Sequence, residues 1–158
     1  ANHFSWGRNP FGIPASKTAG IVRFLMKVVY FSLTGNVRRF VEKLGFPAFE
    51  LNQTNPFLKI SEPFVLIAPS YEKDVTDILW DFMDTNQNHT YCKGVVGSGN
   101  LNFDSLFAYT AKELAYDFDV PFLWAFESFG TERDINHVKE QLHAIADIDC
   151  TDDKSNLF

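Results

Sequence analysis

Residues 28–44 read VVYFSLTGNVRRFVEKL, and this stretch decides the fold. It begins as an apolar run and passes through the polar segment SLTGN. Apolar residues then recur at the spacing of one helix face, at Val37, Phe40, Val41 and Leu44. Apolar positions at i, i+3, i+4 and i+7 predict an amphipathic helix. The stretch therefore predicts a strand that passes through a tight, hydroxyl-rich loop directly into a helix.

The loop between this strand and this helix has the composition of a phosphate site. It consists of Ser32, Leu33, Thr34, Gly35 and Asn36. Backbone N–H groups, hydroxyls and the positive end of a helix dipole converge in such a loop. It lacks the lysine of a nucleoside triphosphatase loop and the three glycines of a dinucleotide fold, so it suits one terminal phosphate, such as that of FMN. The alternative is an ordinary capped turn, and the loop residues alone leave both open.

The composition is that of a soluble globular protein with one domain. The chain has 158 residues, of which 46% are apolar and 22% are charged. A net charge of −6 argues against nucleic acid as a partner, and no apolar run approaches the ~20 residues that span a membrane. The two cysteines, Cys92 and Cys150, have no zinc spacing and fit a reducing cytoplasm. Cys92 is predicted to be a buried thiol, and the histidines show no metal-ligand spacing.

Three segments differ in character along the chain. Residues 1–25 are rich in glycine and proline without clear periodicity, and we interpret them as a non-native or upstream extension with no role in the chemistry. An added structural arm is the alternative. Met26 resembles a natural start, and residues 26–146 form the predicted domain. Residues 147–158 are acidic and polar and are predicted to form a flexible tail.

Strand and helix patterns alternate from Met26 onward. The predicted strands are Lys27–Phe31, Ala48–Leu51, Phe64–Ala68, Gly94–Gly97 together with Cys92, and Pro121–Phe126. Helical patterns occupy residues 35–44, 75–83, 103–118 and 135–145, and Thr131 with Asp134 gives the last one a start like a capping box. Alternating strands and helices predict an α/β fold with a doubly wound, five-stranded parallel sheet. We expect the flavodoxin-like strand order 2-1-3-4-5.

Ligands in such folds bind at the carboxyl ends of the strands, near the point where the strand order reverses. The loops after the first, third and fourth strands should therefore converge. The second and third of these loops contain Ser70, Tyr71 and Glu72, and Gly97, Ser98, Gly99, Asn100, Asn102 and Phe103. Tyr71 and Phe103 would flank a planar ligand, and the glycines would let the backbone approach it.

Each of these residues also has a structural interpretation. Tyr71 could be a surface residue, Phe103 could be the first core position of its helix, and the glycines could serve only the turns. Glu72 could be a solvated loop acid. No Ser-His-Asp or Cys-His order occurs at the loop positions, so nucleophilic catalysis has little support.

Four segments together resemble the NrdI family, the flavodoxin-like proteins of class Ib ribonucleotide reductase. They are residues 29–41, 69–71, 97–103, and 126–131 with 134–135, in this order. The resemblance implies FMN bound without a covalent link. It also implies that reduced flavin reacts with O2 and supplies superoxide or a related oxidant to the dimanganese site of the small reductase subunit, where a tyrosyl radical is assembled. The implied partners are that subunit, O2 and a reductant protein, with no nucleic acid and no membrane.

The resemblance also assigns roles to individual residues. Ser32, Leu33, Thr34, Gly35 and Asn36 would hold the phosphate. Ser70, Tyr71 and Glu72 would flank one side of the flavin ring, and Gly99, Asn100, Asn102 and Phe103 would flank the other. Glu127, Gly130 and Thr131 form a further family-like segment. The chain departs from some members because Glu72, and no glycine-rich stretch, follows the Pro-Ser-Tyr motif.

Two other functions remain possible at the level of sequence. One is a general low-potential electron-carrier flavodoxin, which gains from many carboxylates around the flavin. Here only Glu72, Asp74 and Asp104 lie in the ring loops. The other is an interaction module without flavin. If the flavin is present, it carries the chemistry and the protein supplies binding, orientation and electrostatics.

Overall fold

A computed structural model describes residues 26–100 and 108–155 of the chain. Along the sequence the elements are β1 (Lys27–Phe31), α2 (Asn36–Leu44), β2 (Ala48–Leu51), β3 (Phe64–Ala68), α3 (Lys73–Asp84), the 3-10 helix η2 (Thr85–Tyr91), β4 (Cys92–Gly99), α4 (Tyr109–Phe118), β5 (Phe122–Glu127) and α5 (Glu132–Ser155). The five strands form one sheet in the order β2-β1-β3-β4-β5, and every neighbouring pair is parallel. The predicted fold class and strand order are confirmed.

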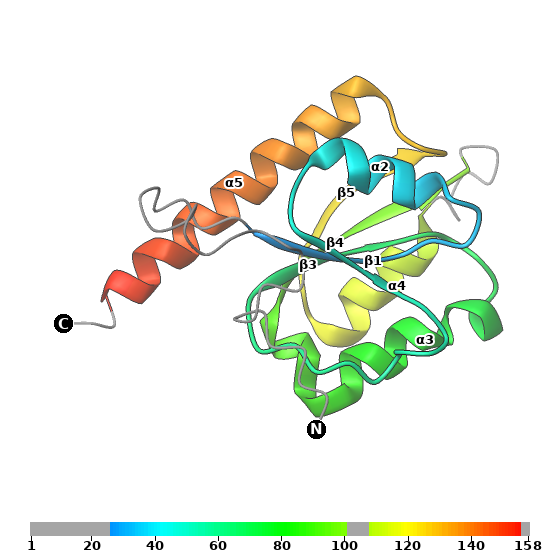
Figure 1. Cartoon of the computed structure of the whole chain (residues 1–158), viewed down its shortest axis with the longest axis horizontal. Coiled ribbons are helices and arrows are strands. Elements are labelled where there is room, and N and C mark those ends of the chain that lie inside the picture. Colours follow the sequence, from blue (N-terminus) through cyan, green and yellow to red (C-terminus); the bar gives the residue numbers. More distant parts are fainter. Residues whose placement is uncertain (1–25, 101–107, 156–158) are drawn as a thin grey trace.

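Helices cover both faces of the sheet (Figure 1). α2 and α5 lie on one face, and α3 and α4 lie on the other. Alternate residues of β1 pack against the helices on opposite faces of the sheet, because successive side chains of a strand point in opposite directions. Val28 and Tyr30 pack with α2 and α5, whereas Val29 and Phe31 pack with α3 and α4. This alternation gives the sheet two separate apolar cores.

α5 is longer than the sequence analysis predicted. Thr131 and Asp134 form the reciprocal bonds of a capping box: the Asp134 N–H donates to Thr131 Oγ1 at 3.2 Å, and the Thr131 N–H donates to Asp134 Oδ2 at 2.8 Å. The helix then continues to Ser155, past the point where a flexible tail was expected. Residues 132–155 contain no glycine or proline to end it.

Cys92 begins β4 and is buried, as predicted, with an exposed fraction of 6%. Burial raises the pKa of its thiol to about 12, so the thiolate is disfavoured at neutral pH. In the described part of the chain, no helix combines the length and apolarity needed to cross a membrane.

Candidate flavin site

A cleft of about 1070 Å³ opens at the carboxyl edge of the sheet, near the upper end of the volumes that ligand pockets have. The loops after β1, β3 and β4 contribute to its wall, as the topology predicted. Most of the predicted site residues line it, namely Ser32, Leu33, Thr34, Asn36, Ser70, Tyr71, Glu72, Ser98, Gly99 and Asn100. Three segments distant in sequence therefore meet in one cavity.

The loop after β1 leaves the N-terminus of α2 open toward this cleft. Gly35 occupies the N-cap position with φ of 94°, and it has no side chain to cap the helix. The Ser32 hydroxyl accepts a hydrogen bond from the Arg38 N–H at 3.2 Å. Among the described residues, the N–H groups of Asn36 and Val37 have no hydrogen-bond partner. Two helix N–H groups and the exposed Thr34 hydroxyl are thus available to an anion.

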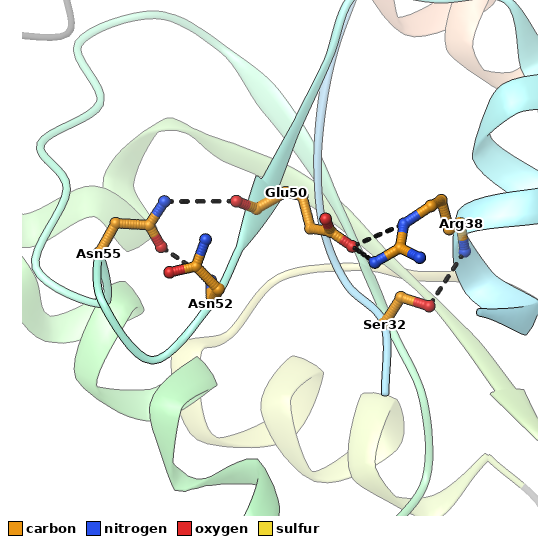
Figure 2. A network of polar contacts seen from close by, with 5 residues as sticks. All are labelled: Ser32, Arg38, Glu50, Asn52 and Asn55. Carbon is orange, nitrogen blue, oxygen red and sulfur yellow. Dashed lines mark hydrogen bonds and ion pairs between the residues drawn. The ribbon is translucent and has the colours of Figure 1, made fainter. Parts of the chain in front are cut away.

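Arg38 itself is held away from this role by Glu50 of β2 (Figure 2). The guanidinium donates twice to Glu50 Oε1, from Nε at 3.0 Å and from Nη2. The bond from Glu50 raises the pKa of Arg38. Asn55 continues the network, since its side-chain amide donates to the Glu50 carbonyl at 3.4 Å. Arg38 does not line the cleft, so the groups that the loop offers to an anion are backbone N–H groups and neutral hydroxyls.

Tyr71 contributes an aromatic side chain to the wall, and this side chain reaches the loop after β1. The Tyr71 hydroxyl donates to Thr34 Oγ1 at 3.3 Å. The neighbouring Ser70 hydroxyl donates to the Ser98 carbonyl at 2.8 Å, which joins the β3 and β4 ends of the cleft. These two bonds connect all three predicted loops across the cavity.

Four predicted residues lie elsewhere. Gly35 shapes the loop through its positive φ without lining the cavity. Asn102 and Phe103 lie outside the residues that the structure describes, so their roles stay predictions. Gly97 does not line the cleft, because β4 continues to Gly99 and Gly97 lies buried within it. A Cβ at Gly97 would come within 2.5 Å of the Ala111 Cβ, so this glycine admits α4 against the sheet rather than a ligand.

The cleft wall also contains residues that were not among the predicted site residues. They are Val37, Pro69, Tyr109, Glu113, Glu127 and Ser128. Val37, Pro69, Glu127 and Ser128 lie in the segments that carry the family resemblance, whereas Tyr109 and Glu113 lie outside them. Glu127 ends β5 and Ser128 follows it, so the tendency of ligands to bind at the carboxyl ends of the strands would have identified both. Tyr109 and Glu113 are four residues apart in α4, which places them on one helix face.

The acids around the cleft differ from those expected. Glu72, Glu113 and Glu127 line it, whereas Asp74 lies on α3 outside the cavity wall. Asp104 is outside the described residues. The acids on the described cleft wall therefore come from different segments than the ring loops indicated, with Glu113 contributed by α4 and Glu127 by β5. In the described ranges, no group of three or more histidine, cysteine or acidic residues is arranged to hold a metal ion.

Strand order, cleft position and the open hydroxyl loop after β1 together define a flavodoxin-like protein. Flavodoxin 2 of Bacillus cereus has the same fold, with a TM-score of 0.55 and 14% identity, over 77% of this chain and 96% of that one. The model of the NrdI flavodoxin-like family matches residues 28–140, and the chain belongs to this family.

Curated relatives agree with this assignment. Protein NrdI of Bartonella tribocorum is 35% identical over 120 residues, which cover 73% of this chain and 91% of that protein. Protein NrdI of Beutenbergia cavernae is 36% identical over 126 residues, which cover 75% of this chain and 91% of that protein. Membership of the family implies a flavin cofactor and an association with ribonucleotide reductase.

Proposed function

We propose that the cleft binds FMN, with its phosphate in the loop of residues 32–36. The observation that carries this proposal is the open N-terminus of α2. Asn36 and Val37 at this N-terminus line the same cavity as Thr34 and Tyr71. A dianionic phosphate is stabilised by such donors and by the helix dipole without any cationic side chain. Tyr71 and the backbone of Gly99 and Asn100 would bound the flavin ring.

Replacing Thr34 by valine tests the phosphate assignment. Valine keeps the shape of threonine and removes one hydroxyl donor, and a lost hydrogen bond to a charged group costs about 1.5–3 kcal/mol. Affinity for FMN should therefore fall roughly tenfold or more, as measured by quenching of flavin fluorescence. Riboflavin carries the same ring without the phosphate and serves as the matched ligand, so its affinity should hardly change. An equal loss for both ligands would exclude the phosphate assignment.

We further propose that the protein activates the small, dimanganese subunit of a class Ib ribonucleotide reductase in the cytoplasm. When bound and reduced by a reductant protein, FMN supplies electrons to O2, and the product serves as the oxidant for assembly of the tyrosyl radical. The protein's own residues bind and orient the flavin and shield its faces. A short-lived oxidant needs a closed path to its acceptor, so the subunit should dock over the cleft rim that contains Tyr71, Glu72 and Asn100.

Charge reversal tests this docking surface. Glu72→Lys changes an exposed side chain on the rim, and Glu140→Lys changes an exposed side chain on α5 as a matched control. We expect Glu72→Lys to weaken binding to the manganese-loaded subunit about fivefold, equivalent to about 1 kcal/mol, with little effect of Glu140→Lys. Titration of the subunit with each variant, in low and in high salt, measures the two affinities. Wild-type affinity in both variants would contradict the docking surface.

An electron-carrier flavodoxin is the second candidate, and the carboxylates of Glu72, Glu113 and Glu127 on the cleft wall favour it. Negative charge near a flavin disfavours its anionic reduced form and lowers the potential, which suits a low-potential carrier. The two functions differ in their partner. A carrier should reduce several acceptor proteins and bind the manganese subunit no better than these. Selective binding to that subunit supports the activator instead.

A further inference from the structure

Arg38 of α2 connects the loop after β1 with the edge strand β2. Its backbone N–H donates to the hydroxyl of Ser32, which lines the cleft. Its guanidinium donates to Glu50 Oε1 from Nε at 3.0 Å and also from Nη2, and Figure 2 shows the side chain directed at this carboxylate. Arg38 therefore contacts the proposed phosphate loop through its backbone and a carboxylate of β2 through its side chain.

The place of Arg38 in α2 brings a cation close to the anion site. Arg38 is the third residue of the helix, whose first turn contains no acidic residue. A cation at this end of a helix is unfavourable, because the helix dipole is positive there, and a bound anion would remove this disadvantage. Helical side chains also lean back toward the N-terminus. A guanidinium released from Glu50 would therefore be free to lean over the turn whose Asn36 and Val37 line the cleft.

Glu50 is placed to withhold this cation from the anion site. It pairs in register with Tyr30, whose side chain packs on the α2 side of the sheet, so the Glu50 side chain lies on that face as well. The side chains of Arg38 and Glu50 keep 48% and 30% of their surface exposed. Ion pairs with this exposure are weak. A phosphate group would therefore compete successfully for the guanidinium if the carboxylate lost its charge.

We propose that Glu50 is a positioning residue that holds the Arg38 guanidinium away from the phosphate loop and so limits the preference of the cleft for FMN over riboflavin. The inference rests on the proposed binding of FMN in this cleft. It explains why an arginine in the first turn of the helix at the anion site contributes nothing to the cleft wall. The phosphate is then bound by neutral donors alone, and a residue of the edge strand sets how tightly.

The test is Glu50→Gln, which keeps the shape of the side chain and a hydrogen-bond acceptor but removes the negative charge. Fluorescence titration of the full chain with FMN and with riboflavin, at low and at high salt, measures the affinities. Glu50→Gln should bind FMN about fivefold more tightly than the wild type at low salt, as expected for one exposed contact between unlike charges. The gain should shrink at high salt, because salt screens such contacts. Riboflavin affinity should stay unchanged.

Glu62→Gln is the matched control for the loss of one negative charge. Glu62 forms an ion pair with Lys27 at 2.7 Å, and Lys27 begins β1 at the end opposite the phosphate loop. Both flavin affinities of Glu62→Gln should be those of the wild type. A gain in FMN affinity as large as that of Glu50→Gln would reflect net charge alone and would overturn the inference.

A double variant, Glu50→Gln with Arg38→Gln, identifies the source of the gain. If the guanidinium supplies it, the double variant should return to the FMN affinity of the wild type. A gain that persists would come from the loss of the carboxylate itself and would contradict the role given to Arg38. Unchanged or weaker FMN binding by Glu50→Gln also overturns the inference, as does an equal gain for riboflavin. Tighter binding of FMN alone is a result that a purely structural residue would not give.

Failure of the proposed function has a different signature. A wild-type chain that does not bind FMN, or that binds FMN and riboflavin equally, defeats the proposed phosphate site before any variant is compared. A wild type that prefers FMN, with no gain in Glu50→Gln, leaves the phosphate site standing and shows that only the role of Glu50 is wrong.

Discussion

Replacing Gly130 by alanine is expected to lower the free energy of unfolding by about 2–5 kcal/mol. Gly130 has φ of 77°, where a residue with a Cβ is strained by about 1–2 kcal/mol. An added Cβ would also lie 2.5 Å from Cδ2 and 2.8 Å from Cε2 of Phe40. Phe40 is fully buried and stacks on Phe126 with ring centroids 3.8 Å apart, so the ring has no room to withdraw. Such overpacking costs about 1–3 kcal/mol.

Gly45→Ala is the control that separates the two costs. Gly45 also has a positive φ, of 71°, but nothing lies within 4 Å of an added Cβ. Gly45→Ala should therefore show only the backbone strain, and the difference between the two variants measures the contact with Phe40. Urea unfolding followed by far-UV circular dichroism gives both values. Equal destabilisation would mean that the turn after β5 moves freely and that Phe40 does not fix it.

The second large effect is expected at Asn88, which is buried in the 3-10 helix η2. Its side-chain oxygen accepts from the Ile60 N–H at 2.8 Å. Its amide donates to the carbonyls of Leu58 at 2.7 Å and Phe82 at 2.8 Å. Asn88→Ala removes the partner of all three backbone groups, and each buried group left unpaired costs about 1–3 kcal/mol. We expect a loss of stability of about 3 kcal/mol or more, measured by urea unfolding.

Asn136→Ala is the matched control for this substitution. Asn136 is exposed on α5, and alanine is the better helix former, so stability should stay the same or rise slightly. If Asn88→Ala were no more harmful than Asn136→Ala, water would replace the amide without cost, and the link between the segment before β3 and the end of α3 would be dispensable.

The strands were predictable because buried parallel strands are continuous apolar runs. β1, β2 and β3 have the predicted bounds. β4 was predicted to end two residues early, since Gly97, Ser98 and Gly99 have the composition of a turn. Pairing with β5 extends it, with Ser98 opposite Phe126 and Gly99 opposite Glu127. Tertiary pairing overrides local preference here, and nothing in the local sequence signals it.

The cleft was predictable only as far as strand ends determine it. The three loops were found because parallel strands place their carboxyl ends at one edge. Tyr109 and Glu113 reach the cleft from the side of a helix, and their contribution depends on how α4 packs on the sheet. That packing depends in turn on Gly97, whose close contact with Ala111 has no counterpart in sequence pattern. Long-range contacts of this kind become visible only in three dimensions.

The central claim is that this cleft binds FMN through its phosphate, and titration of the wild-type full chain tests it most directly. FMN and riboflavin are each added to the protein, and flavin fluorescence is followed to saturation. At least two charge-assisted hydrogen bonds to the phosphate, worth about 1.5–3 kcal/mol each, should make FMN bind roughly a hundredfold more tightly than riboflavin. Equal affinities for the two flavins, or no binding of FMN, would contradict the account.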